Sequence, residues 1–427
     1  METFTTTPYV IRVLVSLLII LAVHKLCKYL SLSVLAGLLV LVVWTGQPVQ
    51  TVLSISWMKL SSGNTLFLLI TILQVIWLST QMAETGIMKD LTHAVINRTS
   101  QRVSMALLPA VIGLLPMPGG ALFSAPLVDD CDVEKKLEPI LKARINYWFR
   151  HIWEYWWPLY PGVLLAVEIS GLSILQFMLL QFSLCLLSIC AGYLFLLRKV
   201  TPQVTGAGSD DSSSLGAVFK PLLPIILVLA IYTAIKVLLP QIADFNKYLP
   251  MMAGILVAQI VLQVQRPLIP VSWRRIILSK TALNMVFLIS LVLIYGAFVD
   301  SRLPDGTPLM SHMRSELSSW GVPLFFIIML IPFICGLTTG VAVGMVGASF
   351  PIVMSLISPD PGFRELASTV LLAYGSGYIG MILSPVHICL IVTNQHFKTG
   401  MPESILKLIK PSLFVLTGAV VLHILIR

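Results

Sequence analysis

Charged residues are scarce in this sequence: aspartate, glutamate, lysine and arginine make up 11% of its 427 residues, against roughly 25% in an average soluble domain. Hydrophobic residues make up 57%, and the mean hydropathy is +0.92. The apolar runs are continuous rather than alternating, which argues against an outer-membrane β-barrel, and they provide for about ten helical spans of ~20 residues. We therefore predict an all-α polytopic protein that crosses the lipid bilayer of the cell inner (plasma) membrane several times.

Paired cysteines and enzyme motifs are also lacking. None of the six cysteines stands at the spacing of a redox or zinc motif, so we expect them to be packing residues. The sequence has no HExxH, GxSxG or Walker motif, and we expect neither an enzyme nor a cofactor. The net charge of +9 is typical of basic cytoplasmic loops, and no nucleic acid is expected as a partner.

The apolar segments predict ten spans. Residues 1–10 lack the charged region and cleavage site of a signal peptide, so the first span is expected to be retained. The spans are expected at 9–23, 31–45, 64–83, 145–170, 173–197, 220–240, 248–264, 281–299, 366–393 and 405–426. An amphipathic stretch at 87–103 predicts an interfacial helix, and a Gly-, Ser- and Asp-rich stretch at 198–218 predicts a flexible cytoplasmic linker.

One apolar stretch, at 115–128, is incompatible with an ordinary helix. It contains two prolines and two glycines within five residues, which interrupt the backbone hydrogen bonds. At membrane depth, bare backbone groups are tolerated only where they are buried in protein or line a cavity. We predict a re-entrant hairpin over about 104–130. A second hairpin is expected over about 321–357, where Gly344 and Pro351 belong to a similar sequence.

The two halves of the chain share a pattern. The hairpin prolines, Pro126 and Pro351, lie 225 positions apart. Pro161 and Pro385 interrupt the spans that follow the two hairpins, and they lie 224 positions apart. We predict that this spacing reflects an internal repeat.

Each predicted repeat, 1–197 and 219–427, holds five spans and one re-entrant hairpin. Because five is odd, the second repeat must have the inverted topology in the membrane. Most of the 28 lysines and arginines fall on cytoplasmic segments when the N-terminus is placed outside the cell. The N-terminus is therefore predicted to be extracytoplasmic, with the first hairpin entering from the cytoplasm and the second from outside.

Inverted repeats with paired hairpins and broken spans place a binding site between them. Half-helices that begin near Gly120, at Gly344 and after the two span-breaking prolines present free N–H groups and a positive dipole end, which suit an anion. Hydroxyl groups beside unwound backbone suit a cation or a hydroxyl-bearing ligand. The predicted substrate-binding residues are Pro118, Gly119, Gly120, Ser124, Pro161, Gly162, Thr338, Thr339, Gly340, Gly344, Ser349, Ser384, Pro385 and His387.

Ionisable residues near the broken spans have alternative interpretations. His387 is either a substrate contact or proton carrier, or a neutral histidine bonded to a backbone carbonyl. Glu154 and Glu168 are expected near the membrane surface, and Arg150 with the tryptophans around it is expected in an interfacial belt. No arginine is expected at the depth of the hairpin tips.

Three acidic residues, Asp129, Asp130 and Asp132, admit two interpretations. They are either the metal site of a membrane enzyme or the cap of a following helix. The sequence has no matching second acidic cluster, which favours the cap.

At 116–120 and 124–128, and again at 384–394, the sequence resembles an uncharacterised ten-span family of prokaryotic membrane proteins grouped with the ion-transporter superfamily. Its better-known relatives include gluconate permeases, citrate and dicarboxylate carriers, and the large membrane subunit of tripartite carboxylate transporters. The hairpin tips depart from the Ser-Asn-Thr of sodium-coupled dicarboxylate carriers.

The resemblance implies an elevator-type secondary transporter. The hairpins and broken spans would form a moving transport domain, and spans such as the first, second, sixth and seventh would form the scaffold of a homodimer. Interfacial helices near 87–103 and 307–320 would connect the two.

We therefore expect a secondary active transporter of a small organic anion, a carboxylate or sugar acid, that works by alternating access with Na⁺ or H⁺ as coupling ion. The alternative is a cation/proton antiporter on the same fold, with His387 as the titrating group. A membrane enzyme that uses the acidic cluster is the least favoured reading.

Overall fold

The computed structural model describes residues 7–87, 90, 99–117, 120–132, 134–200, 216–304, 306–358 and 360–427, and these residues are almost entirely helical. The helices in the first half are α2 (Tyr9–Cys27), α3 (Leu30–Trp44), α4 (Val49–Ser61), α5 (Gly63–Glu84), α7 (Gln101–Gly113), α8 (Ala121–Asp130), α9 (Pro139–Arg150), α10 (Pro161–Ser170) and α11 (Ile174–Phe195), followed by the 3-10 turn Leu197–Lys199. Those in the second half are α12 (Gly216–Leu238), α13 (Pro240–Phe245), α14 (Leu249–Gln265), α15 (Pro270–Ile277), α16 (Lys280–Val299), α17 (Leu309–Ser319), α18 (Leu324–Thr339), α19 (Ala342–Leu356), α20 (Phe363–Ile382), α21 (Ile388–Phe397) and α22 (Met401–Ile426).

Several helices have the length and composition of membrane spans. Six segments of the described chain qualify, and α17 with α18 makes a seventh if this pair, bent by 114°, counts as one span. The shorter apolar helices α3, α10, α14 and α19 lie where the sequence predicts further spans or hairpin arms. The prediction of a polytopic helical membrane protein is confirmed.

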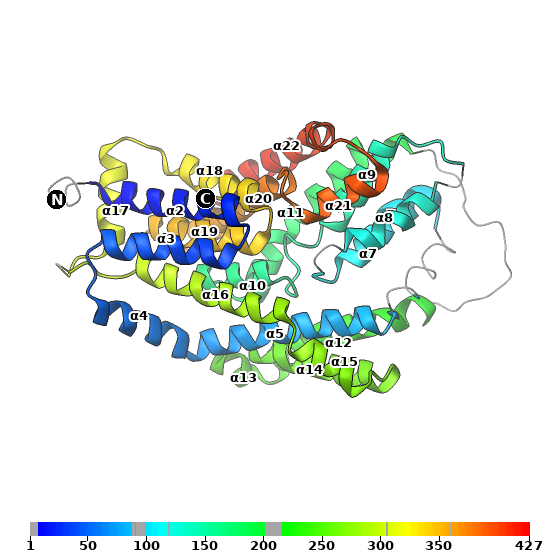
Figure 1. The fold of residues 1–427 in the computed structure, drawn as a ribbon, viewed down its shortest axis with the longest axis horizontal. Helices are drawn as coiled ribbons and strands as arrows, with labels where there is room; N and C mark the ends of the chain where they lie inside the picture. Colours follow the sequence, from blue (N-terminus) through cyan, green and yellow to red (C-terminus); the bar gives the residue numbers. More distant parts are fainter. Residues whose placement is uncertain are drawn as a thin grey trace.

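The helices form two layers along the long axis of the molecule (Figure 1). One layer contains α4, α5 and α12 to α15, in which α14 packs on both α5 and α12. The other layer contains α2 and α3 with the helices from α17 to α22 and from α7 to α9, while α16 contacts α3 and α19 on one side and α4 and α5 on the other. The pairs α2–α3 and α12–α14, expected together in one scaffold, therefore lie in different layers.

Two helical hairpins lie where the proline and glycine pattern predicts them. In the first, α7 packs against α8, and in the second, α18 packs against α19. Figure 1 shows α7–α8 toward one end of the long axis and α18–α19 toward the other. The second hairpin turns at Gly340, whose φ of +64° favours glycine, so α19 begins at Ala342 and not at Gly344 as predicted.

Both predicted broken spans are interrupted, but the first break is longer than expected. Helix α9 ends at Arg150, and turns occupy 151–160 before α10 starts at Pro161. The prediction placed the break only at 160–162. Pro158 accounts for the part of the break that follows Glu154, because its ring excludes the helical position of the Glu154 carbonyl. The second break, at 383–387 between α20 and α21, agrees with the prediction.

Some elements differ from the sequence prediction in other ways. The short helices α4, α13 and α15 were not predicted. Helix α17 lies in the polar stretch at 307–320, while most of the predicted interfacial helix at 87–103 lies outside the described residues.

Close backbone contact joins α18 to α20. A Cβ atom on Gly336 would lie 2.0 Å from the carbonyl oxygen of Gly377, and a Cβ atom on Gly380 would lie 2.1 Å from that of Phe333. Helices approach this closely only where small residues line the contact, as in membrane helix pairs generally.

The close contact between α18 and α20 predicts that a larger residue there will destabilise the protein. Gly380→Ala should lower the free energy of unfolding by about 1–3 kcal/mol, because the added methyl group overpacks the contact. The measurement is the unfolding midpoint of the purified protein in detergent. Gly362→Ala is the matched control, since a Cβ atom there meets nothing within 4 Å. Equal midpoints for the two variants would contradict the packing described here.

Candidate functional site

The two breaks and the two hairpin tips lie against one another. The tip of the second hairpin, Gly340, sits on the second break: a Cβ atom there would lie 3.0 Å from the His387 backbone nitrogen. At the tip of the first hairpin, Met117 and Gly120 lie against Arg150, where the first break begins. A contact between His151 and His387 joins the two breaks, so one chain of contacts runs from tip to tip.

Arg150 is the central charge of this site. Its side chain is buried, with only 2% of the residue exposed, and its Nη2 donates a hydrogen bond to the Met117 carbonyl at 3.0 Å. A Cβ atom on Gly120 would lie 2.1 Å from Nη2, so only glycine admits the guanidinium at this point of the hairpin tip. The Nε atom has no hydrogen-bond partner, and no carboxylate of the described chain lies within 4.0 Å of the guanidinium.

The position of Arg150 corrects the prediction from sequence. The residue lies at a hairpin tip, where no arginine was expected, and Trp148 and Trp157 are buried within the protein as well. The indole of Trp148 donates to the Ser188 carbonyl. A buried cation without a direct ion pair is costly, and the only carboxylate that interacts with it electrostatically among the described residues, Glu154, does not contact it. The arrangement is therefore suited to receive an anion.

Two imidazoles meet next to this arginine. The Nε2 atoms of His151 and His387 lie 3.1 Å apart, and His151 Nδ1 lies 2.6 Å from the Tyr147 carbonyl. Because a carbonyl only accepts, Nδ1 of His151 carries a proton, and its Nε2 offers a lone pair to His387. Cys389 joins the cluster, and its sulfur lies within 4.8 Å of a nitrogen of each ring.

Glu154 also faces the cluster. It is buried within the protein, and its Oε1 lies 3.9 Å from His151 Nε2. Glu168, expected near the surface, pairs with Lys247 at 3.0 Å and accepts from the Tyr248 hydroxyl at 2.8 Å, which ties α10 to α14.

Tyrosine hydroxyls satisfy the carbonyls that the broken helices release. From α20, Tyr378 donates to the His151 carbonyl at 2.6 Å and Tyr374 to the Glu154 carbonyl at 2.8 Å. From α9, Tyr147 donates to the Ile382 carbonyl at 3.0 Å. Tyr160 donates to the Gly113 carbonyl in the first hairpin. The first break is thus stabilised by hydroxyls from α20, and the second break by a hydroxyl from α9.

Four helices begin around this site, namely α8, α10, α19 and α21. The starts of α10 and α19 face each other, since a Cβ atom on Gly162 would lie 2.8 Å from the Ala342 Cβ atom. Helix α8 packs against α21, as α10 packs against α19. The start of α8 lies against Arg150, since Gly120 approaches its guanidinium, and the free N–H groups of a helix start give it a positive dipole end.

The predicted binding residues fall into four groups. The structure brings together those at the breaks and tips: Gly120, Pro161, Gly162, Gly340, Ser384, Pro385 and His387. Ser124, on α8, is buried and its hydroxyl has no partner among the described residues. The hydroxyls of Thr338, Thr339 and Ser349 donate to carbonyls of the preceding turn, and Gly344 packs against Thr339 and Leu30. Pro118 and Gly119 lie outside the described residues.

The acidic cluster of the enzyme alternative lies away from this site. Asp129 and Asp130 end α8. Asp132 accepts from the backbone nitrogens of Lys136 and Leu137, and Lys142 contacts Asp132 at 3.2 Å. The contacts of Asp132 tie down the loop before α9, and Asp129 pairs with the same lysine.

The sequence analysis missed Arg150, His151, Glu154 and Cys389 as site residues. One signal was available: Pro158 lies three residues before Pro161, which extends the break back toward His151.

The fold and the site define a polytopic helical membrane protein with a polar cluster enclosed between interrupted helices. The match to a family model, described as a protein of unknown function (DUF401), extends over residues 10–426, and the chain belongs to that family. No curated protein matches the sequence.

The approach of α10 to α19 can be tested by cross-linking. The double variant Gly162→Cys, Ala342→Cys should form a disulfide on mild oxidation in membranes, because a small separation of the two helix starts reaches the usual Cβ–Cβ distance of about 3.8 Å. With a protease site inserted at 201–215, the two halves should then stay linked after cleavage until a reductant is added. Gly171→Cys with Ala342→Cys is the control, and equal linkage in both would contradict the described contact.

Proposed function

We propose that the protein is a secondary active transporter of a small organic anion, a carboxylate or sugar acid, that works by alternating access. One observation carries the proposal: Arg150 is buried at a hairpin tip without a carboxylate partner. A carboxylate is the group that a guanidinium binds in a bidentate manner. The anion would complete the charge balance, with the surrounding helix starts as further donors.

Paired packing supports the proposal of two inverted repeats. Each hairpin has a proline inside its second arm, Pro126 in α8 and Pro351 in α19. The half-helix after each break packs on the second arm of the other hairpin, α10 on α19 and α21 on α8. Figure 1, with the hairpins toward opposite ends, agrees with entry from opposite sides of the membrane.

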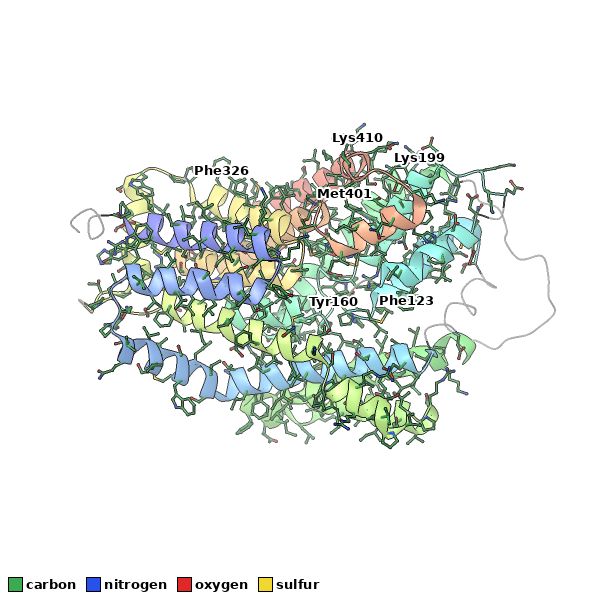
Figure 2. All side chains as sticks on the ribbon, viewed as in Figure 1. Phe123, Tyr160, Lys199, Phe326, Met401 and Lys410 are labelled. Carbon is green, nitrogen blue, oxygen red and sulfur yellow. The ribbon has the colours of Figure 1, made fainter. Side chains whose placement is uncertain are left out.

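The two-layer arrangement suggests which part moves. We propose that the layer of hairpins and broken helices moves against a scaffold containing α5, α12 and α14, through which two copies form a homodimer. Leu122 and Phe123, on the first turn of α8, are 61% and 60% exposed. In Figure 2 the labelled Phe123 lies at the edge of α8 toward the α5 layer. An apolar surface of this kind suits sliding between two protein layers. On the positive-inside rule the N-terminus would be extracytoplasmic in the inner membrane.

A second function, cation/proton antiport, is favoured by one observation. His387 contacts His151 and lies in the same buried cluster as Glu154, which is an arrangement suited to carry a proton. An antiporter would move sodium or potassium in response to a pH gradient without any organic substrate.

The test is electrogenic uptake in proteoliposomes, with mono-, di- and tricarboxylates and sugar acids screened under imposed sodium or proton gradients. We expect a substrate-dependent current. In Arg150→Gln, the apparent affinity should fall at least about tenfold, because a hydrogen bond to a charged group is worth about 1.5–3 kcal/mol. Arg144→Gln is the matched control, a buried arginine on the same helix that bonds only to the carbonyls of Ile140 and Lys407.

Each outcome has a consequence. Equal affinity in Arg150→Gln and the wild type would remove Arg150 from the binding site. Silence across the panel together with a pH-driven sodium or potassium flux would replace the carrier by the antiporter. Alanine at Asp129, Asp130 and Asp132 should perturb transport only mildly, whereas it would abolish an enzymatic activity of the acidic cluster.

A further inference from the structure

We infer that His151, His387 and Cys389 form a binding site for a divalent transition metal ion of the zinc type. One nitrogen of each ring and the cysteine sulfur all lie within 4.8 Å of one another, and all three residues are buried. The site goes beyond the proposed anion transport and does not depend on it, because none of its ligands is needed to bind a carboxylate at Arg150.

The distances fit a metal. The two Nε2 atoms lie 3.1 Å apart. Two nitrogens that each lie ~2.0–2.1 Å from a tetrahedral ion are separated by about 3.3 Å. A small outward movement of the rings would bring the two nitrogens to this separation, and the Cys389 sulfur, within 4.8 Å of both, would move toward them to complete the site.

The surroundings of His151 fit as well. Histidines that bind metals usually donate their other ring nitrogen to a carbonyl or carboxylate, which fixes the tautomer and the ring orientation. His151 does this through Nδ1, at 2.6 Å from the Tyr147 carbonyl. The ring of Tyr147 packs edge-on against His387 and is tilted against His151, which restrains both imidazoles.

The ligand types select the class of ion. Two imidazoles and a thiol suit zinc and related transition metals, whereas magnesium and calcium require oxygen ligands. Three protein ligands leave one position open, as in zinc sites that accept a further ligand. The carboxyl group of Glu154, with Oε1 3.9 Å from His151 Nε2, lies beside the ligands. The Cys389 thiolate offsets part of the charge of the ion and limits the repulsion from Arg150.

The ligands come from both interrupted helices. His151 belongs to the first break, while His387 and Cys389 flank the start of α21 after the second. A bound ion would therefore fasten the two breaks together at the centre of the site.

The test uses the purified full-length protein in detergent, stripped of metal and without any organic anion. Titration with Co²⁺ should give one ion per chain, with the absorption of a tetrahedral site and a thiolate-to-cobalt charge-transfer band. His387 binds the ion after its Nε2 proton moves to Nδ1, which leaves the ring neutral. One proton should be released per ion, as the Cys389 S–H bond is exchanged for an S–metal bond without any change of oxidation state. Zn²⁺ should displace Co²⁺ and raise the unfolding midpoint.

Two variants and two matched controls define the site. Cys389→Ser should remove the charge-transfer band, and Cys389→Ser and His387→Asn should each weaken Co²⁺ binding by at least about 10- to 100-fold. Cys335→Ser and His423→Asn should bind Co²⁺ as the wild type does. Cys335 is a buried cysteine in α18, and His423 is a buried histidine whose Nδ1 contacts the Ser368 carbonyl at 2.9 Å.

The inference is overturned if the wild type does not bind Co²⁺ at one ion per chain. It is also overturned if Cys389→Ser and His387→Asn both bind Co²⁺ with the affinity of the wild type. In the second case the ion lies elsewhere, and the imidazoles share only a hydrogen bond. If one variant does not fold, the other decides. Metal binding without anion uptake would leave this site standing while the proposed transport fails, and uptake without metal binding would do the reverse.

Discussion

The structure depends on satisfying the backbone groups that two interrupted helices release inside an apolar fold. In such surroundings an unpaired carbonyl or N–H group is expensive, because no bulk water replaces the missing partner. The hydroxyls of Tyr374 and Tyr378 bond to carbonyls of the first break, and the hydroxyl of Tyr147 bonds to a carbonyl at the second. The first break is thus stabilised by α20, the helix before the second break, and the second break is stabilised by α9, the helix before the first. The two interruptions therefore stabilise each other.

The same constraint explains which features of the fold could be predicted from the sequence. Long apolar runs and clustered prolines and glycines act locally, and they predicted most of the long helices, both hairpins and both breaks. The start of α19 and the length of the first break depend on which carbonyls find partners in another part of the chain. Pro158 marks the break locally only as far back as Glu154, whereas the irregular backbone reaches His151, whose carbonyl accepts from Tyr378 in α20, and no local signal predicts that contact.

Arg150 shows why the central residue of the site could not be predicted from the sequence. An arginine among tryptophans is typical of a membrane interface, and nothing in the nearby sequence contradicts that interpretation. Only the packing of α7 and α8 onto α9 places the guanidinium beneath the first hairpin tip, against Met117 and Gly120. Ser384, Pro385 and His387 were correctly predicted to lie at the second break, because a proline inside an apolar run marks such a break directly.

Arg150 and His151 are neighbours in the chain, and this adjacency has an energetic consequence. Two sites that share a low-dielectric environment change each other's affinity, and the change is the same in both directions. An anion on the guanidinium would favour positive charge at the His151–His387 pair, whether a proton or a metal ion carries it. A cation on the imidazoles would in turn strengthen anion binding. Because the imidazoles join both breaks, a cation bound there would also hold the two breaks together, and anion binding at Arg150 would strengthen that contact through the same electrostatic interaction.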